Sequence, residues 1–459
     1  MRIPRLIAEN PLYRKIFVET DERNSRTRKN ILFSSIYRGF GMLIGLLMVP
    51  LTLDYLNQEK YGVWLTLMSL VAWFNFFDVG LANGLRSKLA KTFANDDAQM
   101  ARRYVSTAYA ILSIIAILLF ILFASTFNLY SWSGIFNVSP SMEDELRQLV
   151  FAVFFFFAIR FVITLITTIL SADQKLDHAG LLDLVINALS LAAVFVTSSL
   201  APPSLFLLGV MLSGIPVVVL LVASFWYFIG LYKRIAPSFK MIDFALTRDM
   251  ASLSLQFFAL QAMVLLIFLS NNIIIAQLLG PAEVSVFNVV YKYFSVATTV
   301  SILVLNPFWS AAAEAYHKGE MSWLRSSAKL LVKIWAGISL LGIFMLVASP
   351  FIYKLWLGNS IVISWRLSAL MTLYVVVLAW HNSYIYLING IGKIRLQLYV
   401  YILMGIIVIP LSYFLVKVVG MGVEGCVLSM ILCLIPFSAL APVQFYAIIN
   451  GKATGVFDK

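Results

Sequence analysis

The chain has 459 residues, of which 61% are hydrophobic and only 12% are charged, and its mean hydropathy is +0.90. Soluble globular chains are roughly 45–50% apolar and about 25% charged, so this composition excludes a water-soluble fold. The formal net charge of +12 would suggest a nucleic-acid partner in a soluble protein. In membrane proteins basic side chains collect in the cytoplasmic loops instead, so we expect no nucleic-acid partner.

Twelve apolar stretches follow one another, each near the length of about twenty residues that crosses the hydrocarbon of a bilayer. Their apolar residues do not alternate as in the strands of a membrane barrel. We therefore predict an all-α integral membrane protein. The predicted spans lie at about residues 31–53, 61–82, 105–127, 148–170, 181–200, 205–230, 251–270, 285–308, 328–348, 365–388, 397–417 and 424–448.

The distribution of Lys and Arg predicts the orientation of these spans. Alternate connections, starting with residues 1–30, hold 25 basic residues, whereas the connections on the other side hold only Lys60, Arg147 and Lys354. Basic loops remain in the cytoplasm, so both termini are expected there. Residues 1–30 lack the apolar run of a signal peptide. The stretch from Ile3 to Val18 either lies flat on the inner membrane surface or is a loose tail.

The second half of the chain resembles the first at an offset of 223 residues. The stretch from Leu56 to Trp64 aligns with that from Leu279 to Phe287, and the same offset places Asn83 on Asn306. Two units of six spans have the same orientation in the membrane, as in transporters built from parallel repeats. The predicted parts are a cytoplasmic segment (1–30), an N-terminal six-helix bundle (31–230), a cytoplasmic linker (231–250), a C-terminal six-helix bundle (251–448) and a cytoplasmic tail (449–459).

Charged side chains inside a span are costly and often functional. Arg38, Arg160 and Lys292 fall inside the first, fourth and eighth predicted spans, while Asp78 and His381 fall inside the second and tenth. We predict that the three cations line one central cavity and bind an anionic substrate. Asp78 and His381 are candidate charge partners or ion-coupling residues.

Small and polar residues accompany two of these cations. Ser34, Arg38, Gly41 and Gly45 share one face of the first span, and Ser285, Asn288, Lys292, Ser295 and Thr299 share one face of the eighth. Purely structural roles remain open for each charge. Arg38 and Asp78 could form a structural ion pair, Lys292 could extend to the membrane surface, Arg160 could be structural, and His381 could be a hydrogen-bonded packing residue.

Motifs of enzyme active sites are missing from the sequence. It has no Cys/His metal spacing, no G-x-S-x-G and no phosphate-binding glycine loop. Cys426 and Cys433, in the last span, are expected to be buried free thiols. We therefore expect neither an enzyme nor a cofactor or metal, and we expect transport driven by an ion gradient, the membrane potential or the substrate gradient.

Two motifs resemble a known family. The run from Pro50 to Leu56 followed by Tyr61-Gly62-Val63-Trp64, and the run from Asp78 to Arg86, resemble polysaccharide transporters of the O-antigen flippase type. These belong to the multidrug/oligosaccharidyl-lipid/polysaccharide (MOP) exporter superfamily. The resemblance implies a MATE-like fold of two six-helix bundles around a cationic cavity. It also implies that an undecaprenyl-diphosphate-linked oligosaccharide is flipped from the cytoplasmic to the periplasmic leaflet of a bacterial inner membrane. We expect a monomer, with H+ or Na+ as the candidate coupling ion.

Two other classes compete with this interpretation. A cation-coupled multidrug exporter of the same fold would favour buried carboxylates over buried arginines. A membrane-embedded glycosyl or acyl transferase would need an acidic or histidine cluster at a membrane face. Three intramembrane cations against the single carboxylate of Asp78 favour the flippase.

The orientation leads to a direct test. A single cysteine introduced between Asn128 and Arg147 should react with an impermeant reagent added outside the cell, whereas one at Asn450 should react only after the membrane is permeabilised. Labelling of both positions from the same side would contradict the twelve-span topology.

Overall fold

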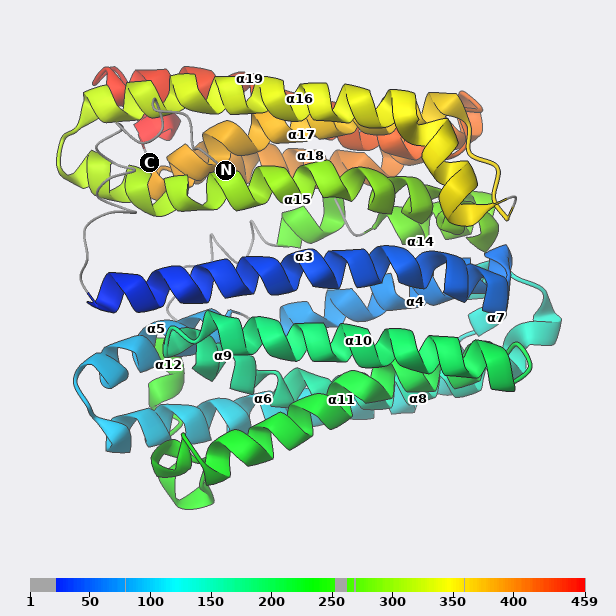
Figure 1. Cartoon of the computed structure of the whole chain (residues 1–459), viewed down its shortest axis with the longest axis horizontal. Helices are drawn as coiled ribbons and strands as arrows, with labels where there is room; N and C mark the ends of the chain where they lie inside the picture. The colour runs from blue at the N-terminus through cyan, green and yellow to red at the C-terminus, as the bar shows by residue number, and fades with distance from the viewer. Residues whose placement is uncertain (1–21, 79, 252–261, 268–269, 359, 459) are drawn as a thin grey trace.

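The computed structural model describes residues 22–458 except Val79, residues 252–261, residues 268–269 and Asn359. Within this part of the chain the regular elements are helices, with no strand. Eleven helices are long and apolar enough to cross a membrane, and one pair bent by 48° brings the number to twelve. The prediction of an all-α fold with twelve spans is confirmed (Figure 1).

The helices fall into two groups. The first contains α3 (Glu22–Leu56), α4 (Gln58–Phe74), α5 (Leu81–Ala94), α6 (Ala98–Thr126), α7 (Trp132–Phe136), α8 (Glu143–Ile163), α9 (Leu165–Ala172), α10 (Leu176–Leu200), α11 (Leu205–Ile229) and α12 (Leu246–Ala251). The second contains α14 (Asn271–Leu279), α15 (Pro281–His317), α16 (Met321–Leu357), α17 (Trp365–Ile391), α18 (Arg395–Tyr413) and α19 (Val423–Ile449).

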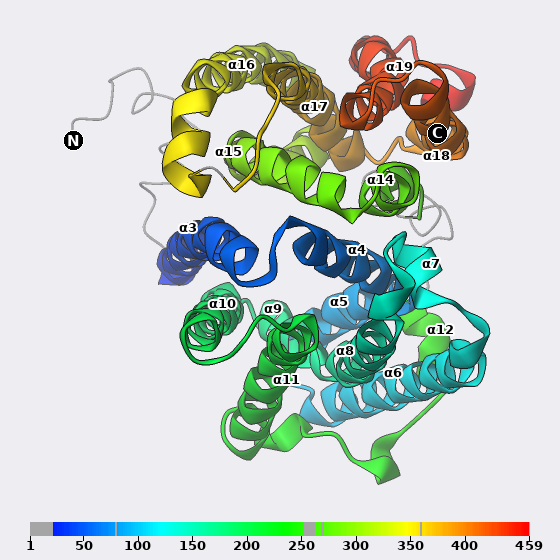
Figure 2. The same cartoon turned by 90° about the vertical axis from the view of Figure 1, so that its right-hand side faces the viewer.

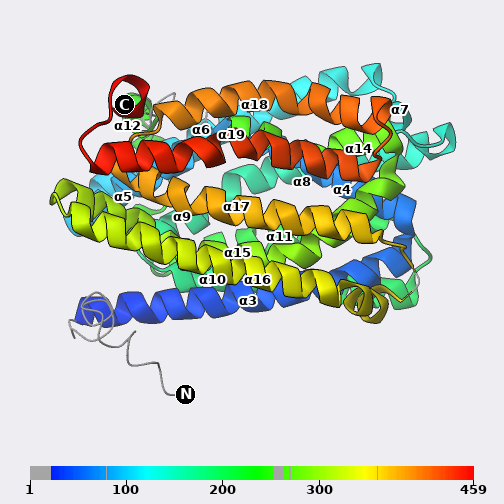
Figure 3. The ribbon, with the colours of Figure 1, turned by 90° about the horizontal axis from the view of Figure 1, so that it is seen from above.

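The two groups lie side by side as an N-terminal and a C-terminal bundle. Figure 2, which looks along the helices, shows α3 and α4 facing α14 and α15 across the division between them. Figure 3 shows the long helices running roughly parallel. The beginning of α3 and the C-terminal residues lie at one end of the molecule, called here the near end, and the opposite end is the far end (Figure 1).

The second predicted span, 61–82, is longer and bent. It begins at Gln58, and after the 3₁₀ turn η1 (Asn75–Asp78) it continues as α5 to Ala94. The break is local, because the Asp78 carboxylate accepts a hydrogen bond from the Gly80 amide at 2.9 Å. Gly80 has φ +74°, a left-handed conformation that glycine adopts without strain.

The seventh span lies further along the chain than predicted. Residues 252–261 of the predicted span 251–270 lie outside the described residues, and the described helical residues of this span are 262–267 and α14, which ends at Leu279. Asn271 and Asn272 fall in the connection between the seventh and eighth predicted spans, whereas both lie in α14. In the structure the Asn272 amide donates to Ser69 Oγ of α4 at 2.8 Å, so a polar pair is satisfied between the bundles.

The offset of 223 residues is a structural repeat. Helix α4 begins at Gln58 and α15 at Pro281, and α6 begins at Ala98 and α16 at Met321. The residues that precede α4 and α15, Asn57 and Gly280, both have positive φ. The two bundles therefore follow one plan.

Contacts between the bundles are reciprocal at the far end. A Cβ atom at Gly62 would lie 1.7 Å from the Pro281 carbonyl oxygen, and Ser285 Oγ donates to the Gln58 carbonyl at 2.6 Å. Under the repeat, Gln58 corresponds to Pro281 and Gly62 to Ser285. The same pair of positions thus meets twice, as in a two-fold symmetric interface.

A second reciprocal pair lies beside the first. The Asn137 amide donates to the Gln277 carbonyl at 3.5 Å, and Ser360 Oγ donates to Asp54 Oδ1 at 3.4 Å. These positions are also related by 223 residues. Among the described residues, the hydrogen bonds that cross between the bundles all lie in the far half of the molecule.

The predicted linker packs on the N-terminal bundle over its described length. Arg102 Nε donates to the Ala236 carbonyl at 2.9 Å, and the amides of Ser238 and Asp243 donate to Ser106 and Thr107 of α6. Helix α12 then packs on α5 and α6. The predicted linker therefore belongs structurally to the N-terminal bundle.

The close approach at Gly62 leads to a prediction. Gly62→Ala should force α4 and α15 apart, because the new methyl group would overlap the backbone of Pro281. Spin labels at Glu59 and Val362, both exposed at the far end, should then report a longer mean distance. Gly39→Ala is the matched control, since nothing lies within 4 Å of its new methyl group. Equal distances in the two variants would show that this contact does not hold the far end closed.

Candidate functional site

One face of α3 carries the contacts of the candidate site. A Cβ atom at Gly41 would lie 3.2 Å from Asn187 Nδ2 of α10, and one at Gly45 would lie 3.5 Å from Cε and 3.7 Å from Nζ of Lys292. The small residues let α10 and the Lys292 side chain of α15 approach α3. Helix α3 therefore lies between its own bundle and the opposite one.

Lys292 extends from the C-terminal bundle toward the N-terminal one, and its side chain is partly buried. One turn toward the far end, the Asn288 amide donates to Asn272 Oδ1 at 2.7 Å. Asn272 in turn donates to Ser69 of α4. The polar face predicted for α15 therefore borders the division between the bundles. Lys292 supplies the positive charge on this face.

Arg38 lies on α3 about one turn nearer to the near end than Gly41. Asp183 of α10 interacts electrostatically with both Arg38 and Arg160. Arg38 and Arg160 are thus brought to one carboxylate, while Lys292 approaches α3 at the level of Gly45. No described pocket is lined by all three cations, and their sharing of one cavity stays a prediction.

Arg160 of α8 lines a pocket of about 260 Å³ inside the N-terminal bundle. Asn75, Thr164 and Ser213 supply further polar atoms to its wall. The Ser213 hydroxyl is buried, and within the described part of the chain it has no hydrogen-bond partner. Unpaired buried polar groups are costly, so this pocket suits water or a polar ligand group.

Asp183 is a functional candidate that sequence reasoning missed. It falls near the start of the predicted fifth span, where a carboxylate resembles an ordinary interfacial residue. The available signal was its spacing, because Asp183, Asn187, Ser190 and Thr197 lie on one helical face. Asp78 is therefore not the single intramembrane carboxylate on which the comparison with drug exporters depended.

Asp78 has a local partner rather than a distant one. Its carboxylate accepts from the Gly80 amide at the bend between α4 and α5. Among the described residues no ion pair within 4.0 Å joins it to Arg38. The geometry accounts for Asp78 as a residue that stabilises the bend, and a part for it in ion coupling stays a prediction.

His381 is buried among α17, α18 and α19, with 1% of its surface exposed. Nδ1 lies 2.9 Å from Ser438 Oγ and Nε2 lies 2.5 Å from the Tyr401 hydroxyl. Because Ser438 Oγ donates its hydrogen to the Leu434 carbonyl, Nδ1 donates to Ser438 and Nε2 accepts from Tyr401. Both ring nitrogens are occupied, which favours the packing role over ion coupling.

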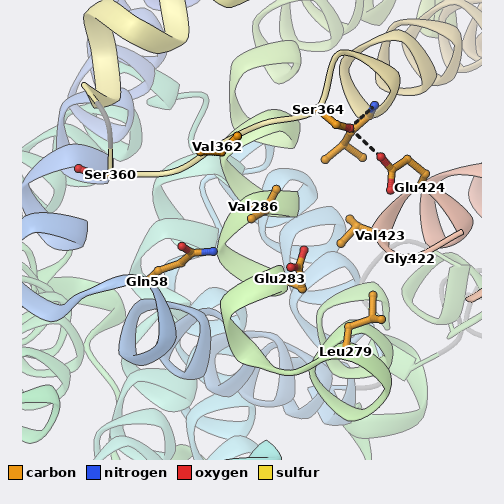
Figure 4. A pocket seen from close by; sticks show the side chains of 11 residues that line it. Gln58, Leu279, Glu283, Val286, Ser360, Val362, Ser364, Gly422, Val423 and Glu424 are labelled. Carbon is orange, nitrogen blue, oxygen red and sulfur yellow. Dashed lines mark hydrogen bonds between the residues drawn. The ribbon is translucent and has the colours of Figure 1, made fainter.

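A separate cavity of about 570 Å³ lies at the far end (Figure 4). Glu283 and Glu424 extend into it beside Gln58, and Ser364 Oγ donates to Glu424 at 2.6 Å. Its charged lining is anionic, so it does not suit an anionic ligand. The cationic candidate residues and this cavity are therefore distinct sites.

Comparisons with known proteins connect this geometry to a family. The model of the family described as polysaccharide biosynthesis protein matches residues 27–313. A Salmonella typhi protein named an O-antigen transporter is 23% identical over 368 residues, covering 77% of this chain and 81% of that protein. A Yersinia pseudotuberculosis protein named an O-antigen export protein is 24% identical, with coverages of 76% and 79%.

Solved structures share the fold. An inward-facing multidrug resistance MATE family transporter of the MOP superfamily superposes with a TM-score of 0.71 at 14% identity, over 91% of this chain and 95% of that one. An outward-facing MATE family transporter gives a TM-score of 0.61 at 14% identity, over 94% and 97%. The MATE-like fold predicted from the sequence is confirmed.

The role of His381 can be tested through its neighbour. Tyr401→Phe removes the donor to Nε2 and keeps the ring stacked on the imidazole. An unsatisfied buried acceptor costs about 1–3 kcal/mol, so thermal unfolding in detergent should occur at lower temperature while transport per folded molecule is unchanged. Tyr413→Phe, exposed on the same helix, is the control. Loss of the dependence of transport on an ion gradient in Tyr401→Phe would instead assign His381 to coupling.

Proposed function

The chain belongs to the polysaccharide biosynthesis protein family, and from this we propose that it is a flippase for lipid-linked polysaccharide units. Its substrate is an oligosaccharide linked to undecaprenyl diphosphate, such as an O-antigen or other surface polysaccharide repeat unit. The protein carries this substrate from the cytoplasmic to the periplasmic leaflet of a bacterial inner membrane. The names of the Salmonella and Yersinia relatives support this substrate class.

The observation that carries the proposal is the placement of Lys292 and Arg38 at α3. Lys292 belongs to the C-terminal bundle and Arg38 to the N-terminal one, yet Lys292 approaches α3 at Gly45, two turns from Arg38. Two turns correspond to about 10 Å along the helix. Cations from both bundles therefore border the division through which a substrate head group would pass.

Phosphate chemistry fits these side chains. The planar guanidinium groups of Arg38 and Arg160 can each donate two parallel hydrogen bonds to phosphate oxygens. The ammonium of Lys292 adds a compact charge. The side chains of Arg38 and Arg160 are exposed and that of Lys292 is partly buried. A bound diphosphate would offset the like charges of the three cations.

The described contacts support a conformation open toward the near end. Hydrogen bonds between the bundles lie in the far half, around Gln58 and Ser285. Lys and Arg are concentrated in the connections on the near side, which supports a cytoplasmic position for both termini. The protein therefore receives its substrate from the cytoplasmic side in this state, and alternating access requires the far-end contacts to open.

The remaining parts follow from this mechanism. The bundles 31–230 and 251–448 move relative to each other, and residues 1–30 and 449–459 stay in the cytoplasm.

The protein works as a monomer and a transporter rather than an enzyme, without nucleic acid, in contact with membrane lipid. Its driving force is a gradient of H+ or Na+, the membrane potential or the substrate gradient. The MATE neighbours share the fold at low identity, and the cationic residues here favour an anionic glycolipid over the alternative, a cationic drug.

The cationic residues should be essential for export. Arg160→Ala and Lys292→Ala should each lower the appearance of surface polysaccharide at least tenfold in cells that lack the native gene, while the protein inserts normally. Arg160→Lys should keep part of the activity, because it retains the charge and loses the two-point hydrogen bond. Lys354→Ala, at the far end of α16, is the control. Export at the wild-type rate by both alanine variants would refute the anionic-substrate argument.

A further inference from the structure

The side chain of Asp183 is exposed, and it lies on the face of α10 that meets α3 at Asn187. Its neighbours on that face, Ser190, Val194 and Thr197, are buried. The opposite face carries Leu181, Val185, Leu189, Phe195 and Val196, which are exposed. An intramembrane carboxylate on the inner face of a helix is a functional candidate by default.

The packing of two helices places Asp183 beside Arg38. Helices α3 and α10 are in extensive contact and touch where Gly41 meets Asn187. They run in the same direction, because each begins at the near end (Figure 1). One turn back along each helix leads from Gly41 to Arg38 and from Asn187 to Asp183, so the two charges lie at the same level.

The Asp183 carboxylate interacts with two arginines and forms a close ion pair with neither. Asp183 interacts electrostatically with Arg160 as well as Arg38. Among the described residues, no ion pair within 4.0 Å includes it. A carboxylate placed between two arginines balances their repulsion and leaves their hydrogen-bond donors accessible to another anion.

We propose that Asp183 is the internal counter-ion of the cationic site and matches its net charge to a diphosphate diester. The proposal rests on the proposed function. Arg38, Arg160 and Lys292 with Asp183 leave two positive charges uncompensated. A diphosphate that joins a lipid to a sugar carries one negative charge on each phosphate, so substrate and site neutralise each other. A lipid joined to a sugar through a single phosphodiester carries one negative charge and would leave one positive charge over.

The charge balance between the site and the diphosphate also favours release of the substrate. Without the carboxylate, three cations would hold the diphosphate more tightly and would retain it after the bundles change their angle. With it, the phosphates replace Asp183 as partners of the two guanidinium groups, and Asp183 regains them when the substrate leaves. Asp183 is a positioning residue in this scheme, because it acts through Arg38 and Arg160 and does not contact the substrate.

The test separates binding from turnover. Purified protein in nanodiscs is titrated with a short-chain polyprenyl diphospho-N-acetylglucosamine, with the matching polyprenyl phospho-N-acetylglucosamine, which carries one negative charge, and with the uncharged polyprenol. Asp183→Asn should bind the diphosphate probe about tenfold more tightly, equivalent to about 1.4 kcal/mol, and should export surface polysaccharide more slowly in cells. Asp183→Glu should restore wild-type values in both assays, since it keeps the charge. Asp177→Asn, on the same helix beside His178, is the matched control and should change neither.

The outcomes are distinguishable. Unchanged or weaker diphosphate binding by Asp183→Asn, while wild-type protein binds the probe, would overturn the counter-ion role and leave the flippase intact. Wild-type protein that binds the diphosphate probe no better than the uncharged polyprenol would instead overturn the proposed function. Slow export by Asp183→Glu with a folded protein would also contradict the proposal, because a charge-balancing role tolerates the longer carboxylate.

Discussion

The fold depends on how closely α4 and α15 approach each other at the far end. Gly62 packs directly against the backbone of Pro281, and Ser285 donates to the backbone of Gln58. Both contacts need a small residue. At Gly62 the α4 backbone lies against the backbone of Pro281, and at Ser285 a short hydroxyl side chain reaches the Gln58 carbonyl. Their position away from the near end leaves the two bundles joined at one end, and the division between them is where charged side chains can remain hydrated.

Helix α3 lies at the division between the bundles. It contacts α10 through Gly41 and Lys292 through Gly45, so one helix connects the charges of both bundles. A charge in hydrocarbon is expensive, whereas one that faces a water-filled space between helices is tolerated. The glycines on α3 and the charges around it are therefore parts of a single arrangement, in which close packing brings cations of different helices within reach of one ligand.

Hydropathy predicted the fold well because the bilayer imposes the length and the helical form of each span. The predictions deviated where polar residues are satisfied inside the protein. Asn272 lies beyond the end of the predicted seventh span, yet it belongs to α14 and its amide donates to Ser69 of the other bundle. Asp78 was paired with Arg38 in one interpretation, whereas its carboxylate bonds to the Gly80 amide two residues away. Such partners depend on tertiary contacts and cannot be read from composition or spacing.

The absence of ion pairs between the bundles, within the described residues, has a consequence for solution conditions. The described ion pairs join residues of the same bundle, and the far end is held by hydrogen bonds and close packing. Dissolved salt weakens attraction between exposed charges and leaves such short-range contacts nearly unchanged. Raising the ionic strength should therefore weaken the capture of an anionic glycolipid while the balance between the open and closed bundles stays almost constant, so affinity and conformation respond to separate physical variables in this protein.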